Sequence, residues 1–241
     1  MIKTKSFEIA SYIKGNEDAS RLALVLPGKL DTKDYPHMRS HVDFLADRGF
    51  FALSFDPPGT WESPGGIEFY TMTNYLKTIN ELIEHFGNKP TILLGHSRGG
   101  SMAILGAITN PHVTHFIAVM SRVGESTPNK PMKPGDTSIS YRDIPWNPKE
   151  NKKFELPFSY FEDSARYNIL EGLKECTKPK LFVLGIHDIT VKPEEVKAAY
   201  EAAAEPKELC EIDSDHNYRF RPVLINAINK IIGKFLDKYT I

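Results

Sequence analysis

The chain has 241 residues, of which 41% are hydrophobic and 25% charged, and its formal net charge is −1. This composition argues against three classes of protein: one that binds nucleic acid through a strongly basic surface, one that is attracted to an anionic membrane by its net charge, and a highly charged disordered chain. No apolar run approaches the roughly 20 residues that a bilayer span needs, and the first residues lack the apolar core of a signal peptide.

Cysteine is used sparingly. The two cysteines, Cys176 and Cys210, fall in separate expected elements and lack the spacing of metal ligands. This pattern favours a reducing compartment over a disulfide framework, so we expect a cytoplasmic protein. The composition leaves monomer and homodimer both open, and it suggests no nucleic-acid or membrane partner.

The chain is expected to open with an antiparallel hairpin at a sheet edge, because residues 3–13 alternate loosely and residues 14–18 form a turn. The continuous apolar run at 22–26 is typical of a strand buried on both faces. Downstream, strand-like runs alternate with helices of amphipathic spacing. Further strands are expected at 50–56, 91–94, 116–120, 180–185 and 207–212, and helices at about 36–47, 67–86, 98–110, 160–176, 193–204 and 221–239.

This alternation predicts an α/β fold with a mainly parallel, doubly wound sheet of about eight strands and the antiparallel hairpin at its N-terminal edge. Residues 1–241 are expected to form one domain. Residues 122–158 interrupt the rhythm, since they are rich in Pro, Lys, Ser and Asn but carry aromatics such as Trp146. So long a segment is either an active-site cover or a disordered insertion. The aromatics favour a small cap, because solvated linkers seldom carry them.

The stretch Gly-His-Ser-Arg-Gly at 95–99 joins an expected strand to an expected helix. In that context the G-x-S-x-G spacing predicts an elbow that holds Ser97 in a sparsely populated backbone conformation. The glycines are needed because a Cβ at either place would collide with the neighbouring strand or helix. The Ser97 hydroxyl would then stand at the positive end of the helix, as a nucleophile. The alternative is a Gly-rich turn with an incidental serine.

A serine nucleophile needs an imidazole to take its proton. Of the eight histidines, His216 is favoured because it follows the last expected strand, at the carboxyl edge of the sheet where functional groups collect. His96 is set aside because its side chain is expected to point back beneath the elbow. His37 follows a loop on the correct side but comes early in the chain.

The imidazole in turn needs a carboxylate to orient it. Asp188 is preferred, because it follows the strand at 180–185 on the same sheet edge and gives the chain order Ser, Asp, His. Its alternative role is a cap before the next helix. Asp213 and Asp215 are too near His216 in sequence to support it from a separate strand.

A carbonyl oxygen under attack needs fixed N–H donors. The backbone N–H of Arg98 is one candidate, and the N–H of Lys29 is the other, with Leu30 as the fallback. The side chains of Lys29 and Arg98 are expected to be ordinary solvated charges, with attraction of an acidic substrate as the alternative. Leu30, Trp61 and Trp146 are candidates for substrate contact.

Taken in order along nearly the whole chain, these pieces resemble the α/β-hydrolase superfamily, and most closely its small esterase and peptidase-like members with a modest cap. Two departures are Pro27, where the family usually has histidine, and Trp61, where it usually has glycine. The matching pieces are Leu26-Pro27-Gly28, the stretch from Asp56 to Ser63, Gly95 to Gly99, Asp188 and Asp215-His216.

The resemblance implies acyl transfer to water: Ser97 attacks, His216 moves the proton, Asp188 orients His216, and an acyl-enzyme forms and is hydrolysed. It implies no metal ion and no organic cofactor. The expected partner is a small-molecule substrate, a carboxylic ester with a small to medium acyl or aryl group. A peptidase or amidase, a thioesterase, an acyltransferase and a non-catalytic ligand-binding protein remain alternatives.

Overall fold

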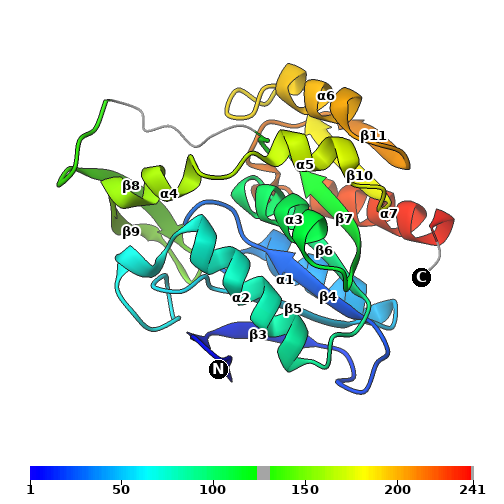
Figure 1. Ribbon diagram of the computed structural model, residues 1–241, viewed down its shortest axis with the longest axis horizontal. Coiled ribbons are helices and arrows are strands. Elements are labelled where there is room, and N and C mark those ends of the chain that lie inside the picture. Colours follow the sequence, from blue (N-terminus) through cyan, green and yellow to red (C-terminus); the bar gives the residue numbers. More distant parts are fainter. Residues whose placement is uncertain (124–130, 240–241) are drawn as a thin grey trace.

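A seven-stranded sheet forms the centre of the protein (Figure 1). The computed structural model describes residues 1–123 and 131–239. All neighbouring strands are parallel except the last pair, which confirms the mainly parallel sheet, with seven strands where about eight were expected. In spatial order the strands are β11 (Lys207–Ile212), β10 (Lys180–Gly185), β7 (Val113–Val119), β6 (Thr91–His96), β4 (Leu22–Leu26), β5 (Phe51–Phe55) and β3 (Ser11–Lys14).

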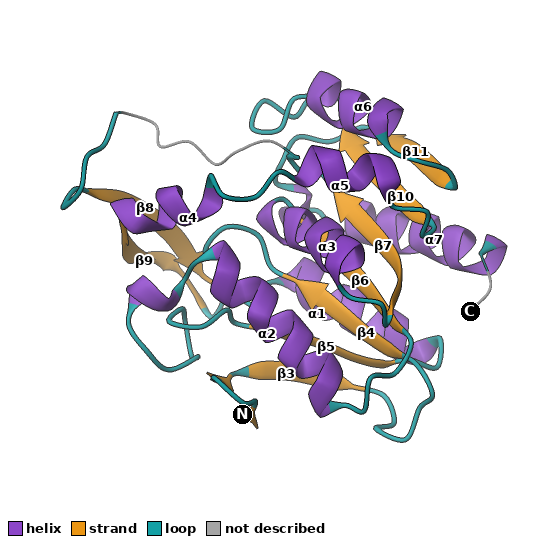
Figure 2. Cartoon of the chain, in the orientation of Figure 1, coloured by secondary structure: helices purple, strands orange, loops and turns teal. Residues whose placement is uncertain are grey.

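Helices cover both faces of this sheet, and Figure 2 shows the strands between the two helical layers. The core is correspondingly split into two apolar clusters, one on each face. One layer holds α2 (Met72–His85), α3 (Arg98–Thr109), α5 (Ile169–Glu175) and α6 (Pro193–Ala202), and the other holds α1 (Pro36–Asp47) and α7 (Pro222–Lys238).

Strand β4 shows why the sequence folds this way. Its residues are all fully buried, and alternate side chains point to opposite faces of a strand. Leu22, Leu24 and Leu26 therefore pack under α2 and α3, whereas Ala23 and Val25 pack under α1 and α7. A continuous apolar run is what a strand needs when helices cover both of its faces.

The N-terminal segment differs in detail from the expected hairpin. A short hairpin, β1 (Ile2–Lys3) with β2 (Glu8–Ile9), stands apart from the central sheet. Strand β3 joins the sheet edge by pairing antiparallel with β5, not with β4, which follows the turn at 14–18. The reason is that β4 is already paired on both sides, with β5 and β6, so at this end of the sheet β5 offers the free edge.

Two expected helices are interrupted. The one expected at 67–86 consists of a short 3-10 turn, η1 (Ile67–Phe69), and α2, because Thr71 caps α2 by accepting a hydrogen bond from the Asn74 N–H. The one expected at 160–176 consists of α4 (Phe158–Ser164) and α5. Asn168 separates them by capping α5 through the Glu171 N–H.

The segment expected to be a cap contains an antiparallel hairpin of β8 (Thr137–Ile144) and β9 (Asn147–Pro157), apart from the central sheet (Figure 1). Residues 124–130 of that segment lie outside the described residues. Side chains of β8 alternate in exposure, as expected for a strand with one wet face.

Among the described helices, none is long and apolar enough to cross a membrane. Cys176 and Cys210 are both free thiols.

Candidate active site

The elbow at the end of β6 positions Ser97. β6 ends at His96 and α3 begins at Arg98, and Ser97 between them has φ 53°, a left-handed conformation that costs free energy for any residue with a Cβ. The two glycines permit this turn. A Cβ on Gly95 would lie 2.1 Å from the backbone of Gly99, and a Cβ on Gly99 would lie 1.9 Å from the Leu26 carbonyl oxygen.

The side chains of Ser97, His216 and Asp188 form one connected chain of contacts. His216 Nε2 lies 3.0 Å from Ser97 Oγ, and His216 Nδ1 lies 2.7 Å from Asp188 Oδ2. The three come from the ends of β6, β11 and β10, which meet at the carboxyl edge of the sheet. The structure thus brings together the three side chains that the sequence predicted as a group.

Asp188 is buried and fixed by its own loop. Its Oδ1 accepts hydrogen bonds from the N–H groups of Thr190, at 2.8 Å, and Val191, at 2.9 Å. Burial by itself would raise the pKa of the Asp188 carboxyl, but the hydrogen bonds from His216 and these amides outweigh it and lower the pKa below its ordinary value. Asp188 is therefore held ionised against the His216 ring.

The competing carboxylates have other partners. Asp213 Oδ1 lies 3.0 Å from Nε2 of His187, and Asp215 pairs with Arg221 at 2.6 Å. Among the described residues, neither forms an ion pair or a hydrogen bond with the His216 ring.

The candidate oxyanion donors lie on either side of Ser97. Arg98 is the first residue of α3, so its N–H has no acceptor within the helix. The loop after β4 approaches from the other side: a Cβ built on Gly28 would lie 3.4 Å from the Ser97 Cβ. Within that loop the Leu30 N–H donates to the Tyr70 hydroxyl at 3.0 Å, whereas no acceptor is assigned to the Lys29 N–H among the described residues. The Lys29 N–H is thus the better placed candidate.

The three residues expected to contact substrate are placed differently. Leu30 is fully buried in the core, so its side chain offers no surface. Trp61 is half-buried and donates through Nε1 to the Leu30 carbonyl at 2.9 Å. The exposed Trp146, in the β8–β9 turn, lies edge-on to Trp61 with ring centroids 6.2 Å apart. Trp61 has φ 46°, a conformation that suits the glycine usual at this place.

Polar contacts tie the β8–β9 hairpin to the loops around Ser97. Arg142 donates through Nε to the Lys29 carbonyl at 3.0 Å. Asp143 accepts from the Tyr35 hydroxyl through its carbonyl, at 2.9 Å, and pairs with Arg219 at 2.6 Å. The hairpin is therefore docked against the loops that follow β4 and β11.

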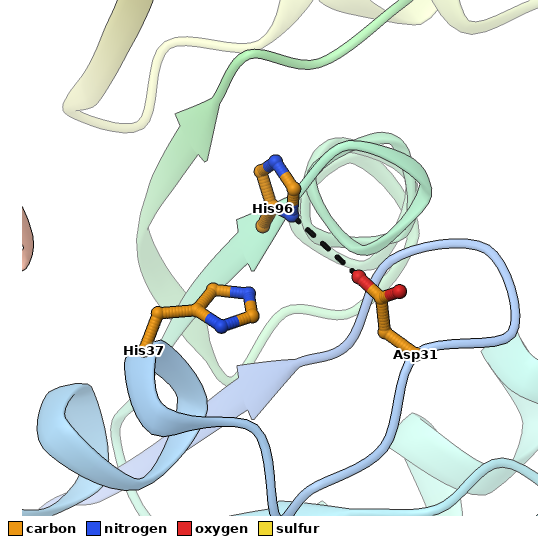
Figure 3. A group of neighbouring side chains, drawn as sticks. All are labelled: Asp31, His37 and His96. Atoms are coloured by element: carbon orange, nitrogen blue, oxygen red, sulfur yellow. Dashed lines mark ion pairs between the residues drawn. The ribbon is translucent and has the colours of Figure 1, made fainter. Parts of the chain in front are cut away.

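A buried cluster of Asp31, His37 and His96 lies beneath the elbow (Figure 3). His96 donates through Nε2 to the His216 carbonyl at 3.1 Å, and its Nδ1 faces Asp31 Oδ2 at 3.7 Å. Burial lowers the pKa of His96, although the facing Asp31 acts in the opposite direction. Among the described residues His96 forms no hydrogen bond with the Ser97 hydroxyl, and its contact supports the backbone of the loop that carries His216. The sequence offered one signal for this pair: His96 ends β6 and Asp31 lies in the loop that follows β4, so both belong to the carboxyl edge of the sheet.

The same cluster is a possible metal-binding group, since one ligand atom from each residue lies within 4.8 Å of the others. The charges around it do not suit a dication. Arg142 Nε lies 3.4 Å from Asp31 Oδ1 and already neutralises that carboxylate. Burial would raise the pKa of Asp31, but His96, Arg142 and Arg219 lower it well below its ordinary range. These positive neighbours make the cluster a poor binding site for a divalent cation.

Comparisons with known proteins agree with this architecture. A family model described as the alpha/beta hydrolase fold matches residues 24–148. The chain is 28% identical over 166 residues to a proline iminopeptidase of Saccharolobus solfataricus, an alignment that covers 65% of this chain and 48% of that protein. The chain thus spans about half the length of this curated relative.

Solved structures share the fold at low identity. One is Est1E from Butyrivibrio proteoclasticus with ferulic acid bound, at 17% identity, 98% coverage of each chain and a TM-score of 0.77. Another is a monoacylglycerol lipase from Paleococcus ferrophilus, at 21% identity, with 97% of this chain and 100% of that chain covered and a TM-score of 0.77.

Proposed function

The chain belongs to the α/β-hydrolase fold family, and on that premise we propose that it is a serine hydrolase that cleaves a carboxylic ester through an acyl-enzyme. One observation carries the proposal: Ser97 Oγ, both ring nitrogens of His216 and Asp188 Oδ2 form an unbroken chain with steps of 3.0 and 2.7 Å. A serine hydroxyl is a poor nucleophile without such a base, and the base needs an oriented carboxylate.

In the proposed reaction, Ser97 Oγ attacks the ester carbonyl while His216 Nε2 takes the hydroxyl proton. Asp188 holds the Nδ1–H tautomer and stabilises the imidazolium that forms. The N–H groups of Lys29 and Arg98 donate to the oxyanion, each contributing roughly 10² to 10³ in rate. His216 then protonates the leaving alcohol, and water activated by the same histidine releases the acid and regenerates Ser97. These steps require neither a metal ion nor an organic cofactor.

The proposed substrate has a small to medium acyl or aryl group. The β8–β9 hairpin acts as a cap in this proposal, because it brings Trp146 and the buried Phe154 against Trp61, with centroids 6.2 and 5.6 Å away. The rings of these three residues offer an apolar surface of the kind that binds an apolar group of a substrate. The fold likeness to Est1E, solved with an aromatic acid bound, and to a monoacylglycerol lipase agrees with an ester substrate.

A peptidase is the second candidate, because the curated relative at 28% identity is a proline iminopeptidase. Both reactions use the same three side chains, so the substrate decides between them. A cytoplasmic location also stays part of the proposal and agrees with the two free thiols.

The test compares p-nitrophenyl esters of increasing acyl length with prolyl and other aminoacyl p-nitroanilides, with Ser97→Ala as the control. We expect ester hydrolysis that disappears in the variant. Turnover of the anilides alone would establish the peptidase instead. Inertness toward both series would favour a ligand-binding protein or a different acyl-transfer reaction.

A further inference from the structure

Two positively charged residues belong to the two backbone segments that meet at the proposed nucleophile. Lys29 follows Gly28 in the loop that approaches Ser97, and Arg98 directly follows Ser97. Both side chains are half-buried, and within residues 1–123 and 131–239 neither forms an ion pair. The hydrogen bond assigned to the Arg98 guanidinium runs to the Met72 Sδ, at 2.7 Å. The burial of Lys29 departs from the expectation of an ordinary solvated charge, whereas for Arg98 that expectation stays a prediction.

The two side chains lie over aromatic rings of one helix, α4. The rings of Tyr160 and Phe161 are called the aromatic wall below. The Lys29 Nζ lies 5.6 Å from the ring centroid of Tyr160 and 5.5 Å from that of Phe161. The Arg98 guanidinium carbon lies 5.8 Å from the same Tyr160 ring. Tyr160 is 1% exposed, and its hydroxyl has no hydrogen-bond partner among the described residues. Two cations thus lie over the ring of one buried tyrosine, whose hydroxyl has no partner among the described residues.

The electrostatic surroundings of Lys29 are positive. Burial lowers the pKa of Lys29 to about 8, and Arg98 and Arg142 act in the same direction. Arg142 is itself matched by Asp31, at 3.4 Å, so that aspartate does not serve Lys29. Aromatic faces attract cations, but they compensate only part of the hydration free energy that a buried ammonium group loses. An anionic group of a bound ligand would compensate the remaining cost.

We propose that Lys29 and Arg98 bind a carboxylate of the substrate, so that the preferred ester carries an acidic group close to its scissile carbonyl. This proposal rests on the proposed function and narrows its substrate class. An arginine fork and an ammonium group are well suited to a carboxylate, and the partly dry setting strengthens the contact. The aromatic wall would cover the intervening carbon atoms.

The test uses two matched pairs of esters. The first is p-nitrophenyl hemiglutarate against p-nitrophenyl valerate, which places the charge on the acyl side. The second is 3-acetoxybenzoate against phenyl acetate, which places it on the leaving group. The quantity compared is the ratio of kcat/KM for the acidic ester to kcat/KM for its neutral counterpart, because each ratio cancels general effects on the catalytic groups.

We expect the wild-type ratio to exceed about 10 in at least one pair, and Lys29→Met and Arg98→Gln each to lower it by about 10-fold or more, the usual effect of a lost charge-assisted hydrogen bond. Lys230→Met, which removes an exposed lysine of α7, is the matched control and should keep the wild-type ratio. A wild-type ratio of one or less in both pairs would overturn the proposal, as would a ratio that neither variant changes.

A further measurement separates the anion site from the proposed function. If the wild type hydrolyses no ester, the proposed function fails, and the anion site is then tested by glutarate. Glutarate should raise the Tm of the wild type but not of the Lys29→Met/Arg98→Gln double variant, and an equal response would overturn the site.

Discussion

Replacing Lys29 by methionine should stabilise the fold while it weakens the proposed anion site. Burial together with Arg98 and Arg142 lowers the pKa of Lys29 from 10.5 to about 8. At 1.36 kcal/mol per tenfold change in proton affinity, keeping the ammonium charged in the folded state costs up to about 3 kcal/mol. Because the side chain is only half-buried, we take about 2 kcal/mol as the expected gain. Methionine retains the length and packs well against aromatic rings.

The assay is thermal unfolding of Lys29→Met and the wild type at several pH values. A gain of about 2 kcal/mol raises the Tm of a chain of this size by about 4 to 8 °C. The pH dependence follows from the direction of the pKa change. Between pH 8 and 10.5 the unfolded chain binds more protons at Lys29 than the folded chain does, so wild-type stability from this group rises with pH in that window. The advantage of the variant should therefore be full below pH 8 and shrink toward pH 10.5.

A Lys29→Met protein that is no more stable than the wild type at pH 7 would refute the reasoning, because the ammonium would then be solvated or paired. A stability gain independent of pH up to 10.5 would also refute it, since that gain would come from packing alone. Lys230→Met is the matched control and should unfold at the wild-type temperature at every pH tested.

Three further predictions concern the elbow and the side chains around it. Gly95→Ala should destabilise the fold by about 3 kcal/mol or more in denaturant unfolding, because the added Cβ meets Gly99 backbone at 2.1 Å; a neutral change would show that the elbow relaxes. His96→Phe should lower kcat by about 10- to 100-fold with little change in KM, because the His216 carbonyl loses its hydrogen-bond donor. His96→Gln retains a donor and should keep much of the wild-type kcat. An equal loss of kcat in both variants would mean that His96 acts through packing. Asp188→Asn should lower kcat by roughly 10³- to 10⁴-fold without unfolding the protein, because an amide donor facing Nδ1 selects the wrong tautomer; near-normal kcat would remove Asp188 from the mechanism.

The parts of the fold and of the site that could be predicted from the sequence are those marked by a local sequence pattern. The elbow could be located because its glycines mark places where a Cβ has no room, and a strand and a helix flank it in sequence. Asp188 and His216 could be grouped with Ser97 because the carboxyl ends of parallel strands share one edge. The structure brings these three side chains into contact.

Features that depend on contacts between segments far apart in the sequence could not be predicted from such patterns. Strand β3 pairs with β5 because β4 has no free edge, a fact of the assembled sheet. The two strands of the β8–β9 hairpin are polar and lack a clear alternation of apolar and polar residues, so the sequence did not predict them as strands. The burial of Lys29 depends on Tyr160 and Phe161, more than 100 residues away, which come to lie over it only once α4 docks.

The central claim, that Ser97 is an activated nucleophile, is tested most directly by covalent labelling with a fluorophosphonate followed by mass spectrometry of the native protein and its peptides. The account predicts one adduct, on Ser97, that is absent in Ser97→Ala and strongly reduced in His216→Ala. A wild-type protein that takes up no label, or labelling that persists unchanged in Ser97→Ala, would contradict it.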